Sequence, residues 1–374
     1  MKISQRGIVN RGDPGTRRAV SSFPTVTCLA DNSLLATYRV GSSKDSEDET
    51  IELRHSEDGG RTWGNPTTPF ETTVNNKRGS LKVLYPTALD GEHLMAAALW
   101  VDRQTYPGKP LFDDQTEGCL PLAILLTDSP DCGRTWTPWR VLPVPDSIGP
   151  PSLTSPILRL PSGKLAASIE TNKNYGDTSA WFQHVVYTYS EDQGRTWNPP
   201  VKVCQDPTGR IFNWDQRAGV CPDGRLVTFT WTYDRETRSY LNVQRRLSPD
   251  EGNTWTAPED LGFTDQPSHP AIFPDGRIVV AWVDRFQSRS IRARLAETND
   301  APFLPATEVV LYELQDLVPT SAMGQGSTGD VLTEMGVWNF GLPYAESLPD
   351  GDVMVVYYAG SAEQMAIEWV RLSL

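Results

Sequence analysis

The sequence of 374 residues predicts an all-β protein, a six-bladed β-propeller, on the strength of three observations. An octapeptide recurs four times, an apolar hairpin pattern recurs six times, and turn-forming residues abound, with 29 glycines and 30 prolines. Repeats with a period of tens of residues are typical of propellers and solenoids. We therefore expect one domain over residues 1–374, although length alone would predict two or three.

The octapeptide is Ser-x-Asp-x-Gly-x-Thr-Trp, and its copies cover residues 56–63, 129–136, 190–197 and 248–255. Ser and Asp side chains accept hydrogen bonds from backbone N–H groups in turns, and Gly supplies the positive φ that closes them. Each copy follows a strand-like segment such as 185–189. We interpret the copies as turns rather than calcium loops, because they offer too few oxygen ligands.

The fainter repeat is an apolar strand, a turn of the Pro-Asp-Gly kind and a second apolar strand. Its turns are 30–32, 89–91, 161–163, 222–224, 274–276 and 349–351. Spacings of 52 to 75 residues leave room for about four strands in each unit, which predicts six four-stranded antiparallel blades. Little chain follows 369–372, so we expect the N-terminal stretch to supply the last strand.

Charge and cysteine content narrow the partners and the compartment. The net charge of −13 and the pI near 4.9 disfavour nucleic acid and anionic membranes as partners. The five cysteines contain no CxxC pair, and residues 1–6 lack a signal-peptide pattern, so we expect reduced thiols and a cytoplasmic location. No phosphate loop, zinc-type spacing or Gly-x-Ser-x-Gly motif occurs, so we expect no metal or cofactor. The oligomeric state stays open.

The inner strand of each blade lines the channel of a propeller, and the second strands end at the same mouth. The inner-strand candidates are Phe23, Tyr85, Ser155, Asp215, His269 and Tyr344. The second-strand ends carry Arg39, Arg103, Glu170, Arg235 and Arg285, mostly beside a residue of opposite charge. Because Arg binds carboxylates bidentately, the set favours an acidic sugar, although each pair taken singly is also explained as a self-satisfied ion pair at a solvated rim.

Hydrolysis of a glycosidic bond requires a proton donor and a nucleophile or base. Asp45 and Asp48 are candidate donors, or else solvated members of the acidic run 45–49. Tyr344 with Glu346 is a candidate nucleophile and base, and the alternative for Tyr344 is an aromatic side chain that fills the channel. His269 has no Ser or Cys partner in the sequence, so we interpret it as a binding or structural residue.

Together these motifs resemble the sialidase (neuraminidase) superfamily over nearly the whole chain. The segment from 34–39 to 54–58 is similar to the sialidase segment that carries a substrate-binding Arg and the acid/base Asp, which implies those roles for Arg39 and Asp45. The segment 343–348 is similar to the family's Tyr-Ser-Asp-Leu segment, which implies that Tyr344 is the nucleophile.

The sequence departs from that family at three places. Ser22-Phe23-Pro24 stands where the family has Arg-Ile-Pro, so one carboxylate-binding Arg is missing. The family's Glu partner of the nucleophile falls near Trp214 or Asp215, and of the two only Asp215 has a carboxylate. The family's Arg in the same blade falls near Tyr233, with Arg235 two residues later.

We therefore expect an exo-acting glycoside hydrolase for a terminal, acidic sugar. The alternatives are a neutral-sugar hydrolase of the arabinanase kind, a polysaccharide lyase using Tyr85, His269 and Arg285, and a non-catalytic glycan-binding propeller. The insertion 104–118 is either a lid or specificity loop or an ordinary surface excursion.

Overall fold

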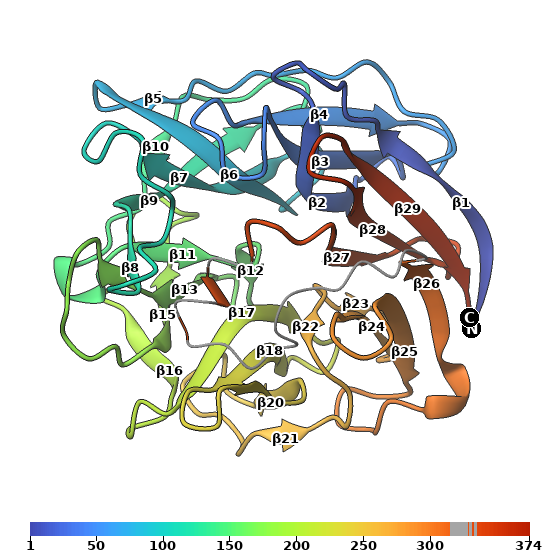
Figure 1. Cartoon of the computed structure of the whole chain (residues 1–374). Coiled ribbons are helices and arrows are strands. Elements are labelled where there is room, and N and C mark those ends of the chain that lie inside the picture. The colour runs from blue at the N-terminus through green and yellow to red at the C-terminus, as the bar shows by residue number, and fades with distance from the viewer. Residues whose placement is uncertain (315–327, 329–330, 333–334) are drawn as a thin grey trace.

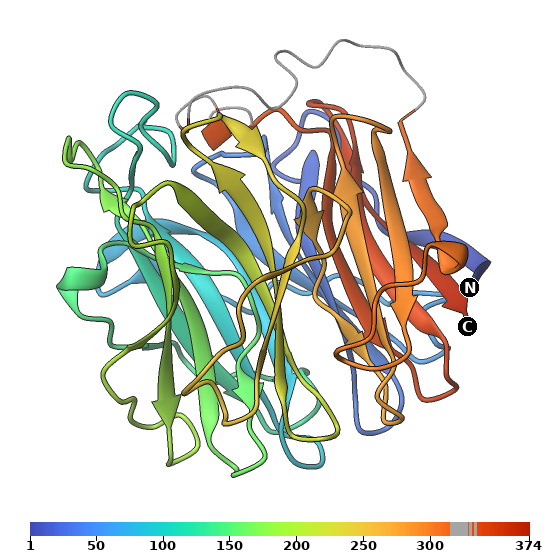
Figure 2. The same ribbon diagram turned by 90° about the horizontal axis from the view of Figure 1, so that it is seen from below.

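Apolar strand segments separated by Gly, Pro and Asp turns give this chain a propeller-like, all-β fold (Figure 1). The computed structural model describes residues 1–314, 328, 331–332 and 335–374. The short 3-10 helices Asp146–Ile148 and Pro305–Thr307 lie between strands. The sheets surround a common centre, and Figure 2 shows their long strands running in roughly the same direction when the molecule is viewed from the side.

The hydrogen-bonded strands form one seven-stranded sheet, four five-stranded sheets and one two-stranded sheet. The seven-stranded sheet contains β1 (Lys2–Asn10), β2 (Val20–Cys28), β3 (Leu34–Gly41), β4 (Thr50–Ser56), β27 (Phe340–Ser347), β28 (Val353–Gly360) and β29 (Met365–Ser373). The next sheet contains β5 (Thr73–Val74), β6 (Lys77–Ala88), β7 (Leu94–Asp102), β9 (Leu122–Ser129) and β10 (Arg140–Val141). The third contains β11 (Pro151–Leu153), β12 (Leu158–Arg159), β13 (Leu165–Thr171), β15 (His184–Ser190) and β16 (Val201–Gln205).

The fourth large sheet contains β17 (Ile211–Val220), β18 (Leu226–Asp234), β19 (Ser239–Tyr240), β20 (Gln244–Ser248) and β21 (Glu259–Asp260). The fifth contains β22 (Gln266–Pro267), β23 (Ala271–Ile272), β24 (Ile278–Asp284), β25 (Ser290–Ala296) and β26 (Val309–Glu313). The two-stranded sheet pairs β8 (Gly118–Cys119) with β14 (Lys173–Asn174) in parallel.

The two ends of the chain meet in the seven-stranded sheet. β1 pairs antiparallel with β29, from Lys2 opposite Ser373 to Asn10 opposite Ile367. β2 joins β29 through one parallel pair, Val20 with Met365. The predicted all-β propeller is thus confirmed in its class, whereas its hydrogen bonding does not divide into six separate four-stranded sheets, because this pair merges two groups of strands.

The hydrophobic core lies between neighbouring sheets. Leu35 and Leu53 of the seven-stranded sheet pack with Leu84, Leu94 and Leu125 of the next sheet, and all five are at most 1% exposed. Burying a leucine side chain contributes about 1.5–3 kcal/mol. Face-to-face packing of this kind holds the sheets around the centre. It thereby fixes the positions of the inner strands, whose side chains point into the centre.

The four octapeptides form the same turn. In each copy the Ser hydroxyl accepts a hydrogen bond from the Gly N–H, at 2.7 to 2.8 Å. The Asp carboxylate accepts hydrogen bonds from the backbone N–H and the hydroxyl of the Thr, at 2.6 to 2.9 Å. The predicted turn role is confirmed, and these carboxylates are engaged within their own turns.

Irregular pairing in the inner strands determines which side chains reach the centre. The ladder skips residues between Ser22 and Thr25 in β2, between Trp214 and Arg217 in β17, and between Gly341 and Tyr344 in β27. Each gap contains a non-glycine residue with positive φ, namely Phe23 (52°), Asp215 (46°) and Leu342 (46°). A bulge re-aims the side chain that it carries. In β6 the skipped residue is Lys82, between Leu81 and Val83.

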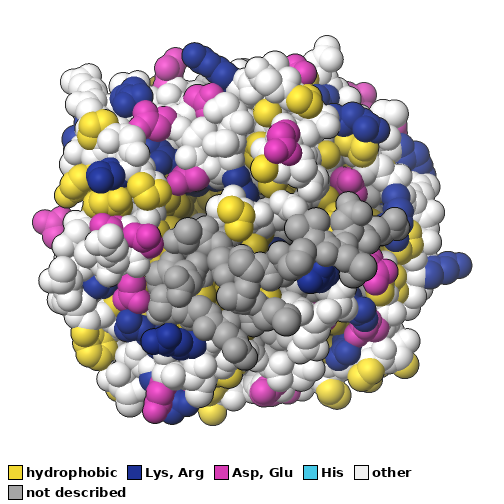
Figure 3. Space-filling model, in the orientation of Figure 1, with side chains coloured by type: hydrophobic (Ala, Val, Ile, Leu, Met, Phe, Trp, Pro, Cys, Tyr) yellow, Lys and Arg dark blue, Asp and Glu magenta, His cyan; other side chains and the backbone are white. Residues whose placement is uncertain are grey.

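The described residues include no membrane-spanning helix, and their cysteines form no disulfide. In the described part of the chain, no helix is long and apolar enough to cross a membrane. All five cysteines are free thiols, and all except Cys28 are buried. On the face shown in Figure 3, acidic and basic side chains are interspersed, so the net negative charge is not gathered there.

Replacing Ser190 by Ala tests the octapeptide turn. Its hydroxyl is the acceptor for the buried N–H of Gly194, and Ser190 itself is 1% exposed. An unsatisfied buried donor costs about 1–3 kcal/mol, so we expect the free energy of unfolding in urea to fall by that amount. The exposed Ser147→Ala is the control. Equal stability of the two variants would show that the turn hydrogen bond is dispensable.

Candidate active site

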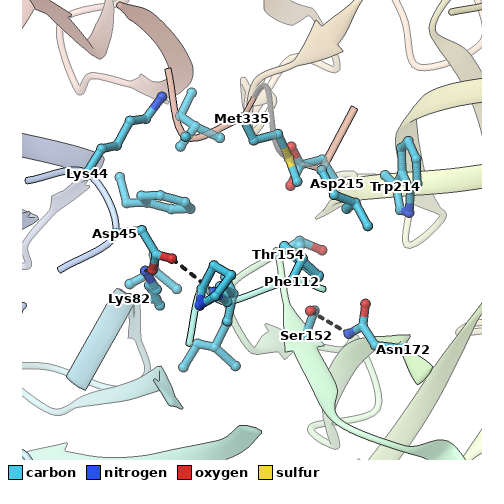
Figure 4. Close-up of a pocket in the computed structure, with 18 of the residues that line it drawn as sticks. Lys44, Asp45, Lys82, Phe112, Ser152, Thr154, Asn172, Trp214, Asp215 and Met335 are labelled. Atoms are coloured by element: carbon cyan, nitrogen blue, oxygen red, sulfur yellow. Dashed lines mark hydrogen bonds and ion pairs between the residues drawn. The ribbon is translucent and has the colours of Figure 1, made fainter. Parts of the chain in front are cut away.

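A pocket of about 730 Å³ opens at the centre, lined by residues of all five large sheets and of the loops between them. Asp45 and Asp215 lie on opposite sides of it (Figure 4). Phe23, Lys82, Asp215 and Leu342, the residues at the irregular positions of the inner strands, all line it. Its volume falls in the range of small-molecule sites, so this is the candidate active site.

Of the residues predicted to form the site, half line this pocket. They are Arg39, Asp45, Arg103, Glu170, Trp214 and Asp215. The others do not belong to the lining, namely Tyr85, Arg235, His269, Arg285, Tyr344 and Glu346. The inner strands β6 and β27 bulge near the pocket and present Lys82 and Leu342 where Tyr85 and Tyr344 were expected. In the fifth sheet Gln266 of β22 lines the pocket and His269 does not.

A charged cluster forms one wall. Lys82 Nζ lies 2.5 Å from Asp45 Oδ1 and 2.7 Å from Glu49 Oε2. Arg103 Nη2 lies 2.7 Å from Asp45 Oδ1, and Arg39 Nη1 lies 3.1 Å from Glu49 Oε1. Glu49 is fully buried, and the three cations are at most 3% exposed. Carboxylates of the chain itself therefore compensate the charges of Arg39 and Arg103, which the sequence predicted to bind substrate, and the charge of Lys82.

Serine hydroxyls on the inner strands hold the two arginines in place. Arg39 Nε donates to Ser22 Oγ, and Arg103 Nε donates to Ser80 Oγ, each at 3.0 Å. Arg39 Nη2 also donates to the carbonyl of Lys44 at 2.7 Å. Each guanidinium thus has fixed partners on several sides and is not free to move toward a ligand.

Asp45 is held as a carboxylate. Burial favours its protonated form, but Lys82 and Arg103 outweigh burial and hold the pKa of Asp45 well below its ordinary value. A general acid must carry a proton at the working pH, and this environment opposes that state. Asp48, the other candidate donor, accepts hydrogen bonds from the N–H and hydroxyl of Ser42 and does not line the pocket.

The insertion 104–118 forms part of the wall rather than an unrelated surface excursion. The N–H of Leu111 donates to Asp45 Oδ2 at 3.0 Å, and the N–H of Gly108 donates to Glu47 Oε1 at 2.9 Å. Lys173 Nζ donates to the carbonyl of Thr116 at 2.7 Å, beside the β8–β14 pair. The loop is therefore anchored on both sides of the pocket.

Glu170 and Asp215 form a pair of carboxyl groups with different surroundings. Glu170 Oε1 accepts hydrogen bonds from the Thr154 hydroxyl at 2.9 Å and from the Gln216 N–H at 2.8 Å. In the described part of the chain it has no ion-pair partner within 4 Å, whereas Asp215 Oδ1 lies 3.5 Å from Arg217 Nη2. Burial and then the charge of Asp215 raise the pKa of Glu170 to about 8, so Glu170 keeps its proton at neutral pH.

Arg217 connects the two carboxyl groups, and the sequence analysis missed it. Its Nη1 donates to the Tyr85 hydroxyl at 2.7 Å and also to the carbonyl of Thr154, whose hydroxyl binds Glu170. Arg217 is 3% exposed. Its position two residues after Asp215 in the same strand was the available indication. The arrangement fixes Asp215 and Glu170 relative to each other.

Tyr344 and Tyr85, which are buried, and His269, which is partly buried, form an aromatic layer outside the pocket lining. The rings of Tyr344 and His269 stack with centroids 4.5 Å apart, and Tyr85 lies 6.3 Å from Tyr344. Burial, and then the charge of Glu346, raise the pKa of Tyr344 well above its ordinary value. Burial, and then Arg217, lower the pKa of His269 to about 3, so the imidazole is neutral. These three rings form no part of the surface that lines the cavity.

The remaining predicted residues are engaged elsewhere. Glu346 accepts a hydrogen bond from the Cys28 N–H at 3.2 Å, and burial raises its pKa to about 7. Arg235 pairs with Glu117 at 3.0 Å. Arg285 donates to the carbonyl of Phe340 at 2.7 Å, with its Cζ 3.8 Å from the centre of the Trp338 ring.

Aromatic side chains form much of the rest of the lining. They are Phe23, Phe112, Trp181, Trp214, Trp231, Trp338 and Tyr358. The ring centroids of Trp214 and Trp231 are 5.4 Å apart, and those of Trp231 and Trp338 are 5.7 Å apart. Flat aromatic faces of this kind stack on sugar rings. In the described residues no group of three or more His, Cys, Asp or Glu side chains could hold a metal ion.

No protein-family model matches the sequence, and neither does any curated protein. The fold is similar to a solved protein of unknown function from Dyadobacter fermentans, at 20% identity and a TM-score of 0.72, covering 100% of this chain and 99% of that one. It is also similar to an intramolecular trans-sialidase from Ruminococcus gnavus, at 14% identity and a TM-score of 0.62, covering 98% and 97%.

An α-L-arabinanase from Penicillium chrysogenum, solved with arabinobiose, is similar at 17% identity and a TM-score of 0.65, covering 99% of this chain and 98% of that one. Glycoside hydrolases with sialidase and arabinanase activities are therefore structural neighbours of this protein. At these identities the likeness shows the propeller fold alone and assigns no reaction.

The raised pKa of Glu170 predicts a pH dependence of stability. Since the carboxyl has a pKa of about 8 when folded and 4.5 ordinarily, the folded state binds more protons between these values and loses stability as the pH rises through them. Glu170→Gln removes that titration, so we expect its stability relative to wild type to be greater at about pH 9 than at about pH 5. Urea unfolding at the two pH values measures the difference.

Glu191→Gln serves as the control for this comparison, because the Glu191 side chain is 63% exposed. A stability difference between Glu170→Gln and wild type that is the same at both pH values would contradict the protonated state assigned to Glu170.

Proposed function

We propose that this protein is a glycoside hydrolase that removes a terminal sugar, with Glu170 as general acid and Asp215 as its carboxylate partner. The observation that carries the proposal is the Glu170–Asp215 pair itself. Among the described residues Glu170 has no ion-pair partner within 4 Å, and burial and the charge of Asp215 outweigh the opposing effect of Arg217 and raise its pKa, whereas Asp215 Oδ1 lies 3.5 Å from Arg217 Nη2. Two carboxyl groups whose environments separate their protonation states are what acid/base cleavage of a glycoside requires.

In the proposed reaction Glu170 donates its proton to the glycosidic oxygen as the bond to the anomeric carbon breaks. If Asp215 attacks that carbon, a water activated by the freed Glu170 carboxylate then hydrolyses the glycosyl–Asp215 bond, which returns a proton to Glu170 and frees Asp215. If Asp215 instead takes a proton from the water that attacks that carbon, Asp215 loses this proton to solvent and the Glu170 carboxylate is reprotonated from solvent. Arg217 and the Gln266 amide, which donates to Asp215 Oδ2, stabilise the carboxylate. The anomer first released, observed by proton NMR, distinguishes the two routes.

The contacts of Tyr344 and Asp45 weigh against the sialidase-type roles that the resemblance implied. Tyr344 does not line the pocket, whereas Glu170 and Asp215 do, so Tyr344 would need to move to reach a substrate. Asp45 is paired with Lys82 and Arg103, which opposes its acting as an acid. The carboxylate pair needs no such rearrangement.

The charged wall of the pocket favours a neutral sugar over the acidic one that the sequence predicted. Arg39, Lys82 and Arg103 are each paired with a carboxylate of the chain, so a sugar acid would find no free cation among them. The aromatic lining suits a neutral pyranose or furanose ring, and the arabinanase among the structural neighbours is consistent with this choice.

We further infer that the seven-stranded sheet represents two blades, which restores the count of six, because only one residue pair joins its two halves.

Substitutions at the pair test the assignment. Loss of a general acid lowers kcat about 10²- to 10⁴-fold, so we expect Glu170→Gln to lose that much on an oligosaccharide. It should lose far less on a dinitrophenyl glycoside, whose leaving group needs no proton. Asp215→Asn should lose activity on both, whereas Asp128→Asn, outside the pocket, should not. If Tyr344→Phe abolishes activity and Glu170→Gln does not, the assignment is wrong.

A panel of aryl glycosides tests the sugar class. We expect kcat/KM for an arabinoside or a rhamnoside to exceed that for a sialoside or a uronide by about 100-fold, because each unpaired buried charge costs several kcal/mol. Preferred turnover of the sialoside would contradict the neutral-sugar proposal. Release of an unsaturated sugar product would indicate a lyase, and binding without turnover would indicate a glycan-binding propeller.

A further inference from the structure

The charged wall of the pocket contains a complete anion-binding site. Lys82 Nζ and Arg103 Nη2 converge on Asp45 Oδ1 at 2.5 and 2.7 Å, and the N–H of Leu111 donates to Asp45 Oδ2 at 3.0 Å. Two cations and a backbone N–H on the two oxygens of one carboxylate are the pattern by which proteins bind small anions. The donors are rigid, since the side chains of Lys82 and Arg103 are 4% and 1% exposed.

The anion that fills this site belongs to the chain itself. Asp45 comes from the loop after β3, not from a strand, and its side chain is 28% exposed, lining the pocket opposite Asp215 (Figure 4). The second carboxylate of the cluster, Glu49, is fully buried and pairs with Arg39 and Lys82. Removing the Asp45 carboxylate would leave three cations beside one carboxylate, around a vacancy that opens on the pocket.

We propose that Asp45 is a specificity-determining residue: its carboxylate occupies the anion site of the pocket and thereby excludes acidic sugars. A carboxylate on a ligand and the carboxylate of Asp45 compete for the same three donors. The exclusion of sugar acids as substrates rests on the proposed glycosidase function, whereas the occupied anion site rests on the geometry alone. In a variant without the Asp45 carboxylate, the vacated site binds a small carboxylate such as acetate. The same vacancy allows the pocket to bind a uronic acid.

Asp45→Ala vacates the site, and acetate is the probe that fits it. Titration with sodium acetate against sodium chloride, followed by the fluorescence of the pocket tryptophans, measures the affinity. We expect Asp45→Ala to bind acetate at least about tenfold more tightly than wild type, because hydrogen bonds in which the donor and acceptor are charged are stronger than neutral ones.

Asp128→Ala is the matched control. Its carboxylate is also partly buried, at 23% exposure, and pairs with Arg140 at 2.5 Å, but it lies outside the pocket. If Asp45→Ala and Asp128→Ala bind acetate equally, or if neither differs from wild type, the proposal is overturned. If Asp45→Ala is unfolded in chloride, the proposal predicts that acetate restores its folded circular dichroism spectrum, and failure to do so contradicts it.

Substrate class is tested separately with galacturonate and galactose as competing ligands. We expect the ratio of their affinities to shift toward galacturonate by about tenfold or more in Asp45→Ala, and an unchanged ratio would contradict the specificity role. These are binding measurements that do not depend on turnover. The two proposals can fail separately. If no glycoside is hydrolysed, but the Asp45→Ala variant binds acetate and the wild type does not, the proposed function is wrong and the anion site is supported.

Discussion

The site depends on one constraint, the free-energy cost of burying a charged group away from water. A charge buried at the centre of a propeller needs a partner or must be neutralised. Lys82 and Arg103 meet that requirement with Asp45, and Asp215 meets it with Arg217. Glu170 has hydrogen-bond donors but, in the part of the chain that the structure describes, no ion pair, and it meets the requirement by keeping its proton. The same physics thus produces an ion-paired wall and an acid beside a carboxylate.

The irregular inner strands turn this chemistry toward the pocket. Because side chains alternate between the two faces of a strand, a single extra residue changes which of them points inward. In β27 the bulge presents Leu342 and leaves Tyr344 buried against His269. In β17 it presents Asp215 itself. One propeller scaffold can therefore expose different groups at its centre, which is why fold likeness alone does not give the reaction.

The sequence predicted the features that arise from local, repeated motifs. It did not predict the features that depend on the register of strand pairing or on contacts between residues far apart in the chain. The octapeptide turns follow from local hydrogen bonding and were predicted correctly. Asp215 and Glu170, which line the pocket, were predicted as a catalytic and a substrate-binding residue because the relevant strand ends meet at one mouth. Lys82 was missed because nothing in a single sequence marks a one-residue bulge, and the pairing of Asp45 with Arg103 joins side chains 58 positions apart. The merged seven-stranded sheet depends on one residue pair and has no sequence pattern.

The most direct test of this account is a titration of the Glu170 carboxyl carbon by ¹³C NMR, in wild type and in Asp215→Asn. Burial and the charge of Asp215 are the causes of its raised pKa, so the account predicts a midpoint near pH 8 that falls when Asp215 is neutral. A midpoint near the ordinary value of 4.5 in both proteins would contradict it, because Glu170 would then have no proton to donate at neutral pH.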